Sequence, residues 1–294
     1  MPKSDFVHAN GIRIHYLREG SGPPLVLLHG WPEFSGVWEQ CIALLAPHFD
    51  VIAPDLRGFG DTDKPYDGPS TAMTPDVLAD DLAGLLDALS VSERVGVVAH
   101  DVGAYAAQTF ARNHAERLAG LFLFNCPHPG IGRRWIEADH VPEIWYQTFN
   151  CLPWTAEMVG SSREACRLYI GHFLRHWAAD DHVFDKDLER FVDNFMKPGN
   201  LQGGFNWYSS IREARRAQMK GDIAPLARIE APTRVFWGER DPVLKAEWMD
   251  NLSETFADLE ADVAPGLGHF VHYEDSERAA GEIARFFTGL RARA

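Results

Sequence analysis

Three ionisable side chains of this sequence are placed where they could act together. Asp101, Asp241 and His269 each follow a run of apolar residues that is typical of a buried strand. Because parallel strands bring their carboxyl ends to one edge of a sheet, we expect these side chains to lie close together. A carboxylate can attack carbon, and a histidine that a second carboxylate orients can activate water. The set predicts a hydrolytic site with Asp101 as nucleophile, His269 as base and Asp241 as the partner of the base.

Asp101 stands at a sharp turn between an apolar strand and a helix, within the run VGVVAHDVGAYAAQ. Small residues flank the turn, as a nucleophile elbow requires, although serine or cysteine is the usual residue at its apex. Taken singly, each residue has another explanation: Asp101 could cap the helix, Asp241 could be a turn residue, and His269 could be a surface histidine. Their shared place at strand ends, in the order nucleophile, acid, histidine, favours the triad.

Composition limits the kinds of partner that the protein can bind. The 294 residues are 46% hydrophobic and carry a formal net charge of −14. Nucleic acid and anionic membranes would need a basic face, so we exclude both as partners. The four cysteines have no CxxC spacing and are expected to be reduced thiols. No apolar leader and no uncharged apolar run of roughly 18 residues occurs, which predicts a cytoplasmic protein without membrane insertion.

Strand and helix patterns alternate along most of the chain. The pair Asn10-Gly11 between two apolar-patterned segments predicts an N-terminal hairpin. Unbroken apolar runs without alternation are typical of strands buried on both faces, as in a parallel sheet. We expect strands at 24–28, 49–53, 95–99, 118–125, 233–238 and 259–263, and helices at 37–45, 74–89 and 276–290.

The pattern of apolar residues changes between about residue 130 and residue 219, where strand-like runs are absent and helical spacing dominates. Strand–helix alternation with an inserted helical stretch predicts an α/β protein with a mostly parallel central sheet flanked by helices. The insert is expected to form a cap between two parts of the core. The predicted domains are a first core part at 1–128, a helical cap at 129–219 and a second core part at 220–294.

Nearly the whole chain, about 6–287, resembles the α/β-hydrolase fold enzymes that use an aspartate nucleophile, and among them it is most similar to the epoxide hydrolases. Several of its motifs are shared with related dehalogenases. The resemblance implies an α/β-hydrolase fold. It rests on HGWPE at 29–33, RGFGDTDKP at 57–65, AHDVGA at 99–104, GERDPV at 238–243 and GHF at 268–270.

The resemblance implies a two-step mechanism that explains the carboxylate at the elbow. Asp101 attacks a saturated carbon and forms an alkyl-enzyme ester. His269, oriented by Asp241, then activates water to attack the carboxyl carbon of Asp101 itself. The backbone N–H groups of Trp31 and Val102 are expected to form the oxyanion hole for that second step.

An epoxide oxygen becomes an alkoxide when the ring opens, so it needs acid donors, and epoxide hydrolases use a pair of cap tyrosines. The run GFNWY makes Tyr208 one candidate, and IWYQ makes Tyr146 the other. We therefore expect a neutral, largely apolar epoxide as substrate and a vicinal diol as product, with no cofactor and no metal. A homodimer is left open. The residues expected to bind substrate are Trp31, Trp145, Phe149, Trp207 and Phe270.

Other functions remain as alternatives. Haloalkane dehalogenases typically place Trp after the nucleophile, and fluoroacetate dehalogenases place Arg residues there, whereas this chain has Val102. A hydrolytic dehalogenase of either type is therefore the second candidate, and Trp145 beside Tyr146 keeps the haloacid type open. A relative that binds a ligand without catalysis is the third candidate, which the complete triad disfavours. An ordinary esterase is disfavoured because Asp101 replaces serine.

Overall fold

The structure is a computed structural model that describes residues 2–65, 73–222 and 225–293. Eight strands of this described part form one sheet in the order β1-β2-β4-β3-β5-β6-β7-β8. The contacts of β2 with β1 and with β4 are antiparallel, and the others are parallel, so the predicted α/β class with a mostly parallel sheet is confirmed. The strands are β1 Lys3–Ala9, β2 Ile12–Gly20, β3 Pro24–Leu28, β4 Asp50–Pro54, β5 Val95–His100, β6 Leu118–Phe124, β7 Thr233–Gly238 and β8 Leu259–Ala264.

The predicted N-terminal hairpin is present as β1 and β2. Ala9 pairs with Ile12, which leaves a two-residue turn between the strands. Asn10 and Gly11 both have positive φ, 45° and 76°, as the tight turns of hairpins require. The local sequence is therefore sufficient to specify this element.

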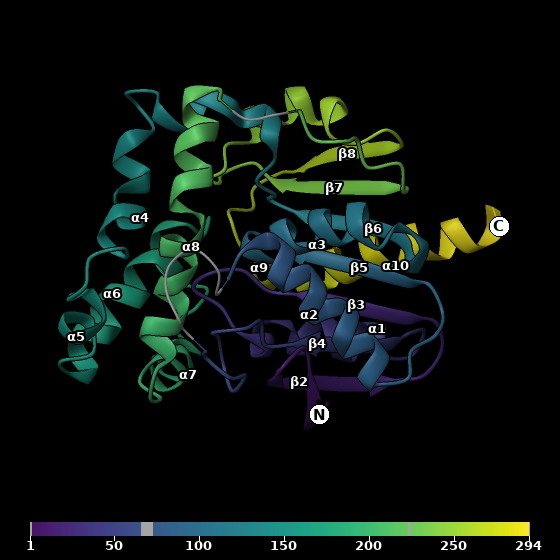
Figure 1. The fold of residues 1–294 in the computed structure, drawn as a ribbon, viewed down its shortest axis with the longest axis horizontal. Helices are drawn as coiled ribbons and strands as arrows, with labels where there is room; N and C mark the ends of the chain where they lie inside the picture. Colours follow the sequence, from purple (N-terminus) through teal and green to yellow (C-terminus); the bar gives the residue numbers. More distant parts are fainter. Residues whose placement is uncertain (1, 66–72, 223–224, 294) are drawn as a thin grey trace.

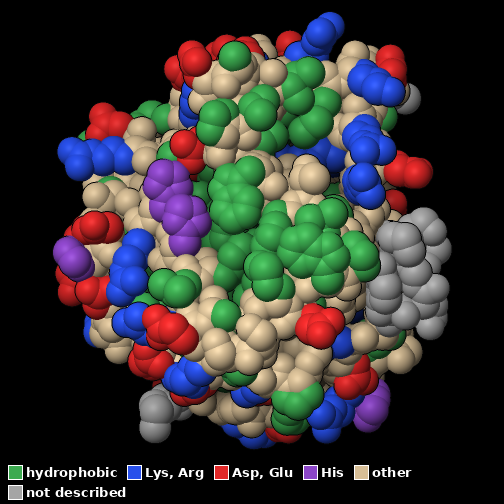
Figure 2. Space-filling model, turned by 90° about the vertical axis from the view of Figure 1, so that its left-hand side faces the viewer, with side chains coloured by type: hydrophobic (Ala, Val, Ile, Leu, Met, Phe, Trp, Pro, Cys, Tyr) green, Lys and Arg blue, Asp and Glu red, His purple; other side chains and the backbone are tan. Residues whose placement is uncertain are grey.

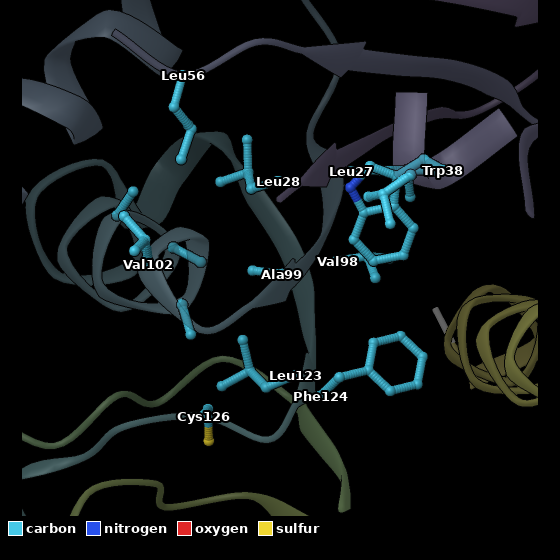
Figure 3. Packing of buried hydrophobic residues seen from close by; sticks show 14 of the residues in the cluster. Leu27, Leu28, Trp38, Leu56, Val98, Ala99, Val102, Leu123, Phe124 and Cys126 are labelled. Carbon is cyan, nitrogen blue, oxygen red and sulfur yellow. The ribbon is translucent and has the colours of Figure 1, made fainter. Parts of the chain in front are cut away.

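Apolar side chains fill both faces of the central strands. Side chains alternate between the two faces of a strand, so consecutive residues pack against different helices. Figure 3 shows Leu28 and Ala99 pointing toward the helix that begins at Val102, whereas Val98 and Phe124 point to the other side, where the ring of Trp38 lies. Because β3, β5, β6 and β7 need apolar side chains on both faces, their sequences show no alternation of polar and apolar residues.

Helices cover the sheet as two packed pairs, α2 with α3 and α1 with α10 (Figure 1). α2 begins after Thr74, whose hydroxyl accepts a hydrogen bond from the N–H of Val77, as the sequence TPD predicts. One expectation is corrected: the helix predicted at 37–45 is a 3₁₀ turn followed by an α-helix, because its first turn closes i→i+3 bonds. The helices of the core are η1 Ser35–Trp38, α1 Glu39–Leu45, α2 Pro75–Ala88, α3 Val102–Asn113, η2 Ala115–Arg117, η5 Ala246–Glu254, α9 Val271–Glu274 and α10 Ser276–Arg293.

The segment between β6 and β7 is helical in its described part, as the spacing predicted. In Figure 1 its helices gather beyond one end of the strands, with α8 lying nearest to the sheet. We retain the division into core and cap as a proposal. The helices of this segment are η3 Pro129–Ile136, η4 Val141–Ile144, α4 Trp145–Phe149, α5 Thr155–Val159, α6 Arg163–His176, α7 Leu188–Phe195 and α8 Asn200–Lys220.

Candidate active site

Asp101 forms the turn between β5 and α3, with φ 45° and ψ −110°. This backbone conformation is rare for a residue with a side chain and is typical of nucleophile elbows. Two glycines make the turn sterically feasible. A Cβ on Gly30 would lie 2.6 Å from the Cβ of Asp101, and a Cβ on Gly103 would lie 2.6 Å from the carbonyl oxygen of Leu28. The small residues around Asp101 therefore allow the elbow to pack against the end of β3.

Asp241 and His269 form a buried hydrogen-bonded pair. The Nδ1 of His269 lies 2.7 Å from the Oδ2 of Asp241, and neither side chain is exposed. The Oδ1 of Asp241 accepts hydrogen bonds from the backbone N–H groups of Val243 and Leu244 at 2.8 and 2.9 Å. Asp241 therefore stabilises its own turn as well as pairing with His269. The role as a turn residue, which the sequence left as an alternative, and the role as partner of the histidine both apply.

His269 presents its other ring nitrogen toward no partner in the described structure. Its Nε2 is buried and has no hydrogen bond to any residue that the structure describes. Burial lowers the pKa of His269, but the carboxylate of Asp241, with a smaller contribution from Asp101, raises it to a net value above the ordinary one. An imidazole with one nitrogen on a carboxylate and the other free can take a proton from water.

The backbone N–H of Trp31 donates a hydrogen bond of 3.0 Å to the Oδ1 of Asp101. The peptide bond between Trp31 and Pro32 is cis. Val102 is the first residue of α3 and is buried directly after the elbow. The structure therefore brings the backbone of Trp31, one of the two expected oxyanion donors, to the carboxylate, and places the other at the N-terminus of α3.

Tyr146 on α4 and Tyr208 on α8 meet at the ring of Trp31. The ring of Tyr146 stacks on Trp31 at 5.3 Å between centroids, and the ring of Tyr208 packs edge-on at 5.5 Å. The two tyrosine rings lie 5.4 Å apart. Burial raises the pKa of both phenols, and the charge of Asp101 raises them further. Both hydroxyls are therefore protonated donors at neutral pH.

The other residues expected to bind substrate lie in different places. Phe270 is fully buried and packs against His269, with 5.0 Å between ring centroids. Trp207 packs against Tyr105 on α3 at 5.3 Å and not against Trp31. Phe149 lies against Tyr169, 5.4 Å away.

Trp145 is 44% exposed on the outer face of the helical segment. It lines an open hollow of about 440 Å³ together with Met158 and Leu168. Figure 2 shows hydrophobic side chains gathered on this face. Its indole ring packs on Phe173, and its ring contacts among the described residues do not include Tyr146.

Two residues of the site escaped the sequence analysis. The amide of Asn125 donates a 2.6 Å hydrogen bond to the Oδ2 of Asp241, and its Oδ1 accepts from the N–H of Gly238. Asn125 follows β6, so its polar side chain at a strand end was an available signal. The ring of Trp177 lies 5.0 Å from His269 and its carbonyl oxygen accepts the backbone N–H of His269. No local pattern indicated that contact.

A buried carboxylate with two histidines lies beneath His269. Glu33 accepts hydrogen bonds from the N–H of Gly30, from His100 at 3.0 Å and from His272 at 2.8 Å. Burial raises the pKa of Glu33, yet the two histidines bring it well below its ordinary value. This trio and the group His15, Asp55 and Asp61 have ligand atoms spaced closely enough for a metal ion.

The sequence of this protein matches the family model described as alpha/beta hydrolase fold over residues 23–276. The chain belongs to the alpha/beta hydrolase fold family. A soluble epoxide hydrolase of Corynebacterium sp. (strain C12) is 30% identical over 96% of each chain. The solved structure of epoxide hydrolase CorEH without ligand is 28% identical, covers 99% of this chain and 100% of that chain, and superposes with a TM-score of 0.82.

Relatives with similar sequences carry different names. A cis-3-alkyl-4-alkyloxetan-2-one decarboxylase of Shewanella oneidensis is 27% identical and covers 97% of this chain and 88% of its own. Family membership therefore does not by itself decide the reaction, and the groups around the elbow must do so. Among the described residues of this alpha/beta hydrolase, no helix combines the length and the apolar character needed to cross a bilayer.

Proposed function

We propose that this protein is an epoxide hydrolase that forms a covalent ester on Asp101. The observation that carries the proposal is the pair of buried phenols, Tyr146 and Tyr208, packed on Trp31 within reach of the charge of Asp101. The similarity to enzymes named epoxide hydrolases supports it.

In the first step a carboxylate oxygen of Asp101 attacks a ring carbon and the carbon–oxygen bond of the epoxide breaks. The negative charge moves to the epoxide oxygen, where the hydroxyls of Tyr146 and Tyr208 donate hydrogen bonds and one of them supplies a proton. General acids of this kind contribute typically about 10²–10⁴-fold to the rate. The product of the step is an alkyl ester of Asp101.

In the second step the free Nε2 of His269 takes a proton from water, and the hydroxide attacks the carboxyl carbon of Asp101. Asp241 stabilises the imidazolium that forms. The tetrahedral oxyanion accepts hydrogen bonds from the backbone N–H groups of Trp31 and Val102. One such donor is worth about 3 kcal/mol. Collapse breaks the ester bond, and the imidazolium of His269 protonates the departing alkoxide, which completes the vicinal diol. The carboxylic acid of Asp101 returns a proton to the tyrosinate left by the first step, which restores the carboxylate and the phenol.

The test is a single turnover of excess enzyme with styrene oxide in water labelled with oxygen-18. We expect the label to enter the carboxylate of Asp101 in the wild type, because water attacks the enzyme and not the substrate carbon. The variant His269→Gln is expected to accumulate a covalent adduct on the peptide that contains Asp101, found by mass spectrometry. Asp101→Asn is the matched control and should form no adduct. Label in the diol alone, with none in Asp101, would refute the mechanism.

A second candidate is hydrolytic dehalogenation by the same Asp101, and one observation favours it. The indole N–H of Trp31 is buried beside Tyr146 and has no hydrogen-bond partner among the described residues, and such a donor can hold a leaving halide. Halide release from a haloalkane and from a haloacid, measured beside diol release from styrene oxide, separates the two activities.

A further inference from the structure

Glu274, the last residue of α9, is a partly buried carboxylate beside the loop that carries His269. Its Oε1 accepts hydrogen bonds from the backbone N–H groups of Gly268 at 3.1 Å and Phe270 at 3.0 Å. These two residues are the neighbours of His269 in the sequence. The side chain of Glu274 therefore holds the backbone on both sides of the proposed base.

The other carboxylate oxygen of Glu274 connects this loop to the helical segment. The Oε2 accepts hydrogen bonds from the backbone N–H groups of Ala179 at 2.9 Å and Gly268 at 3.0 Å. Ala179 lies after α6 and is separated from Glu274 by 95 positions in the sequence. A carboxylate that only capped α9 would bind N–H groups of its own turn and would not need Ala179. One side chain thus joins the loop of the base to a segment that is distant in the sequence.

The loop and the helical segment also touch each other directly at His269. The backbone N–H of His269 donates a hydrogen bond of 2.8 Å to the carbonyl oxygen of Trp177, whose ring packs 5.0 Å from the imidazole. A Cβ on Gly268 would lie 2.5 Å from that carbonyl oxygen and 2.5 Å from the backbone nitrogen of Ala179. The contact is therefore too close for a side chain at Gly268, and it brings both segments within reach of Glu274.

Glu274 only accepts hydrogen bonds in these contacts, as an ionised carboxylate does. Burial raises the pKa of Glu274, and the N–H groups of Ala179, Gly268 and Phe270 oppose that rise. Among the residues that the structure describes, its hydrogen-bond partners are backbone groups alone, although buried charges are usually paired with an opposite charge. Hydrogen bonds to an ionised acceptor are roughly twice as strong as neutral ones, so Glu274 fixes the positions of the backbone groups around it.

We propose that Glu274 is a positioning residue for the second step, which fixes the loop of His269 against the helical segment so that Nε2 keeps its place at the ester of Asp101. The inference rests on the proposed function. The hydrogen bond of 2.7 Å between Nδ1 and Asp241 sets the rotation of the imidazole ring but not the position of the loop that carries it. A displacement of about 1 Å in a reacting group can lower a rate about 100-fold, so the loop needs a support of its own.

The test is Glu274→Gln, which keeps the size of the side chain and replaces one accepting oxygen with an NH₂ group that cannot accept. We expect the covalent adduct on Asp101 to form within about threefold of the wild-type rate and to decay about tenfold or more slowly, because only the decay uses His269. Both rates are measured by rapid quench and mass spectrometry, at a pH where the decay rates of the two proteins have levelled off.

Asp275→Asn is the matched control for Glu274→Gln. It removes the neighbouring carboxylate, which accepts a hydrogen bond from the backbone N–H of Arg278 at the start of α10, and its adduct should decay at the wild-type rate. Wild-type decay in Glu274→Gln would overturn the inference. Equal slowing of adduct formation and decay would also overturn it, because a general loss of structure would then explain the change.

Hydrogen–deuterium exchange tests the same contacts without turnover. The glutamine amide has one accepting oxygen, so Glu274→Gln can keep the hydrogen bond to Ala179 or the one to Phe270, but not both. We expect faster exchange at residues 177–180 or at residues 268–271, and no such change in Asp275→Asn. Wild-type protection of both segments in Glu274→Gln would overturn the inference.

The two measurements separate the inference from the proposed function. If the wild type forms no adduct on Asp101, the proposed function fails, and hydrogen exchange alone decides whether Glu274 joins the two segments. If the wild type hydrolyses its adduct and Glu274→Gln does so at the same rate, the inference fails and the proposed function stands.

Discussion

At the scale of single residues, the backbone N–H of Trp31 has two successive tasks in the proposed reaction. It holds the Oδ1 of Asp101 at 3.0 Å in the free enzyme, and it would hold the oxyanion formed from the same carboxyl group in the second step. A serine elbow needs a base to create its nucleophile, whereas Asp101 needs the base His269 only when its ester is hydrolysed. The histidine should therefore control the second step and leave the first unaffected.

The rate of ester hydrolysis is expected to depend on pH through His269. The pKa of His269 lies above the ordinary value of about 6.5, and only the neutral imidazole can accept a proton from water. In the ester the charge of Asp101 is gone but Asp241 still raises the pKa of His269, so the rate of hydrolysis should rise with pH and level off above that pKa. Decay of the covalent adduct, followed by rapid quench across this range, measures it, with the rate of adduct formation as the comparison. A decay rate that does not rise with pH would contradict the assignment of the base.

Asn125 is expected to matter for both stability and hydrolysis. Asn125→Ala would leave the Oδ2 of Asp241 with one partner fewer and the buried N–H of Gly238 with none. An unpaired buried donor costs about 1–3 kcal/mol, so urea denaturation should show a loss of that order. The rate of adduct hydrolysis should fall more than the rate of adduct formation, because Asp241 would orient His269 less firmly. Equal slowing of both steps would indicate a general loss of structure.

At the scale of elements, the strands and the hairpin could be predicted because their signals are local. Asn10-Gly11 specifies a turn by its backbone preferences, and the apolar runs specify strands with two buried faces. The contact between Trp177 and His269 could not be predicted from local sequence signals. Trp177 directly follows α6, far from His269 in the sequence, and the contact exists only because the helical segment packs on the end of the sheet. The carboxylate of Glu33 meets His272 because the loop after β3 lies against α9, which is also a contact between distant parts of the sequence.

The close approach of β3 to the elbow gives a test at this scale. Gly30→Ala would place a Cβ 2.6 Å from the Cβ of Asp101, so we expect loss of activity and a clear fall in thermal stability. Gly281→Ala is the matched control, because no atom of the described residues lies within 4 Å of the added Cβ and the residue lies in α10. Alanine there should stabilise the protein by about 0.5–1 kcal/mol. Differential scanning calorimetry and an epoxide assay measure both changes, and an active Gly30→Ala enzyme would contradict the packing of the elbow.

At the scale of the whole molecule, buried histidines make the free energy of unfolding depend on pH. Burial lowers the pKa of His128, His140 and His272 to about 4, with a smaller contribution from neighbouring cations at His140 and from His100 and His269 at His272. These histidines titrate near 6.5 in the unfolded chain. Between pH 6.5 and pH 4 the unfolded state therefore binds more protons than the folded state, and the free energy of unfolding falls as the pH falls.

The raised pKa of His269 changes the free energy of unfolding in the opposite direction, because it adds stability as the pH falls. That gain is complete at about pH 6.5 and does not offset the loss below that pH. We therefore expect stability to decline steeply from about pH 6.5 to pH 4.5, by on the order of 2 kcal/mol for each such histidine. His128→Gln keeps a donor for the carbonyl oxygen of Trp248 and removes one titration, so its curve should be shallower. His8→Gln, on the exposed hairpin, is the control and should follow the wild type. Urea denaturation at intervals across this window measures the slopes, and parallel curves for His128→Gln and the wild type would show that His128 is not the neutral buried group inferred here.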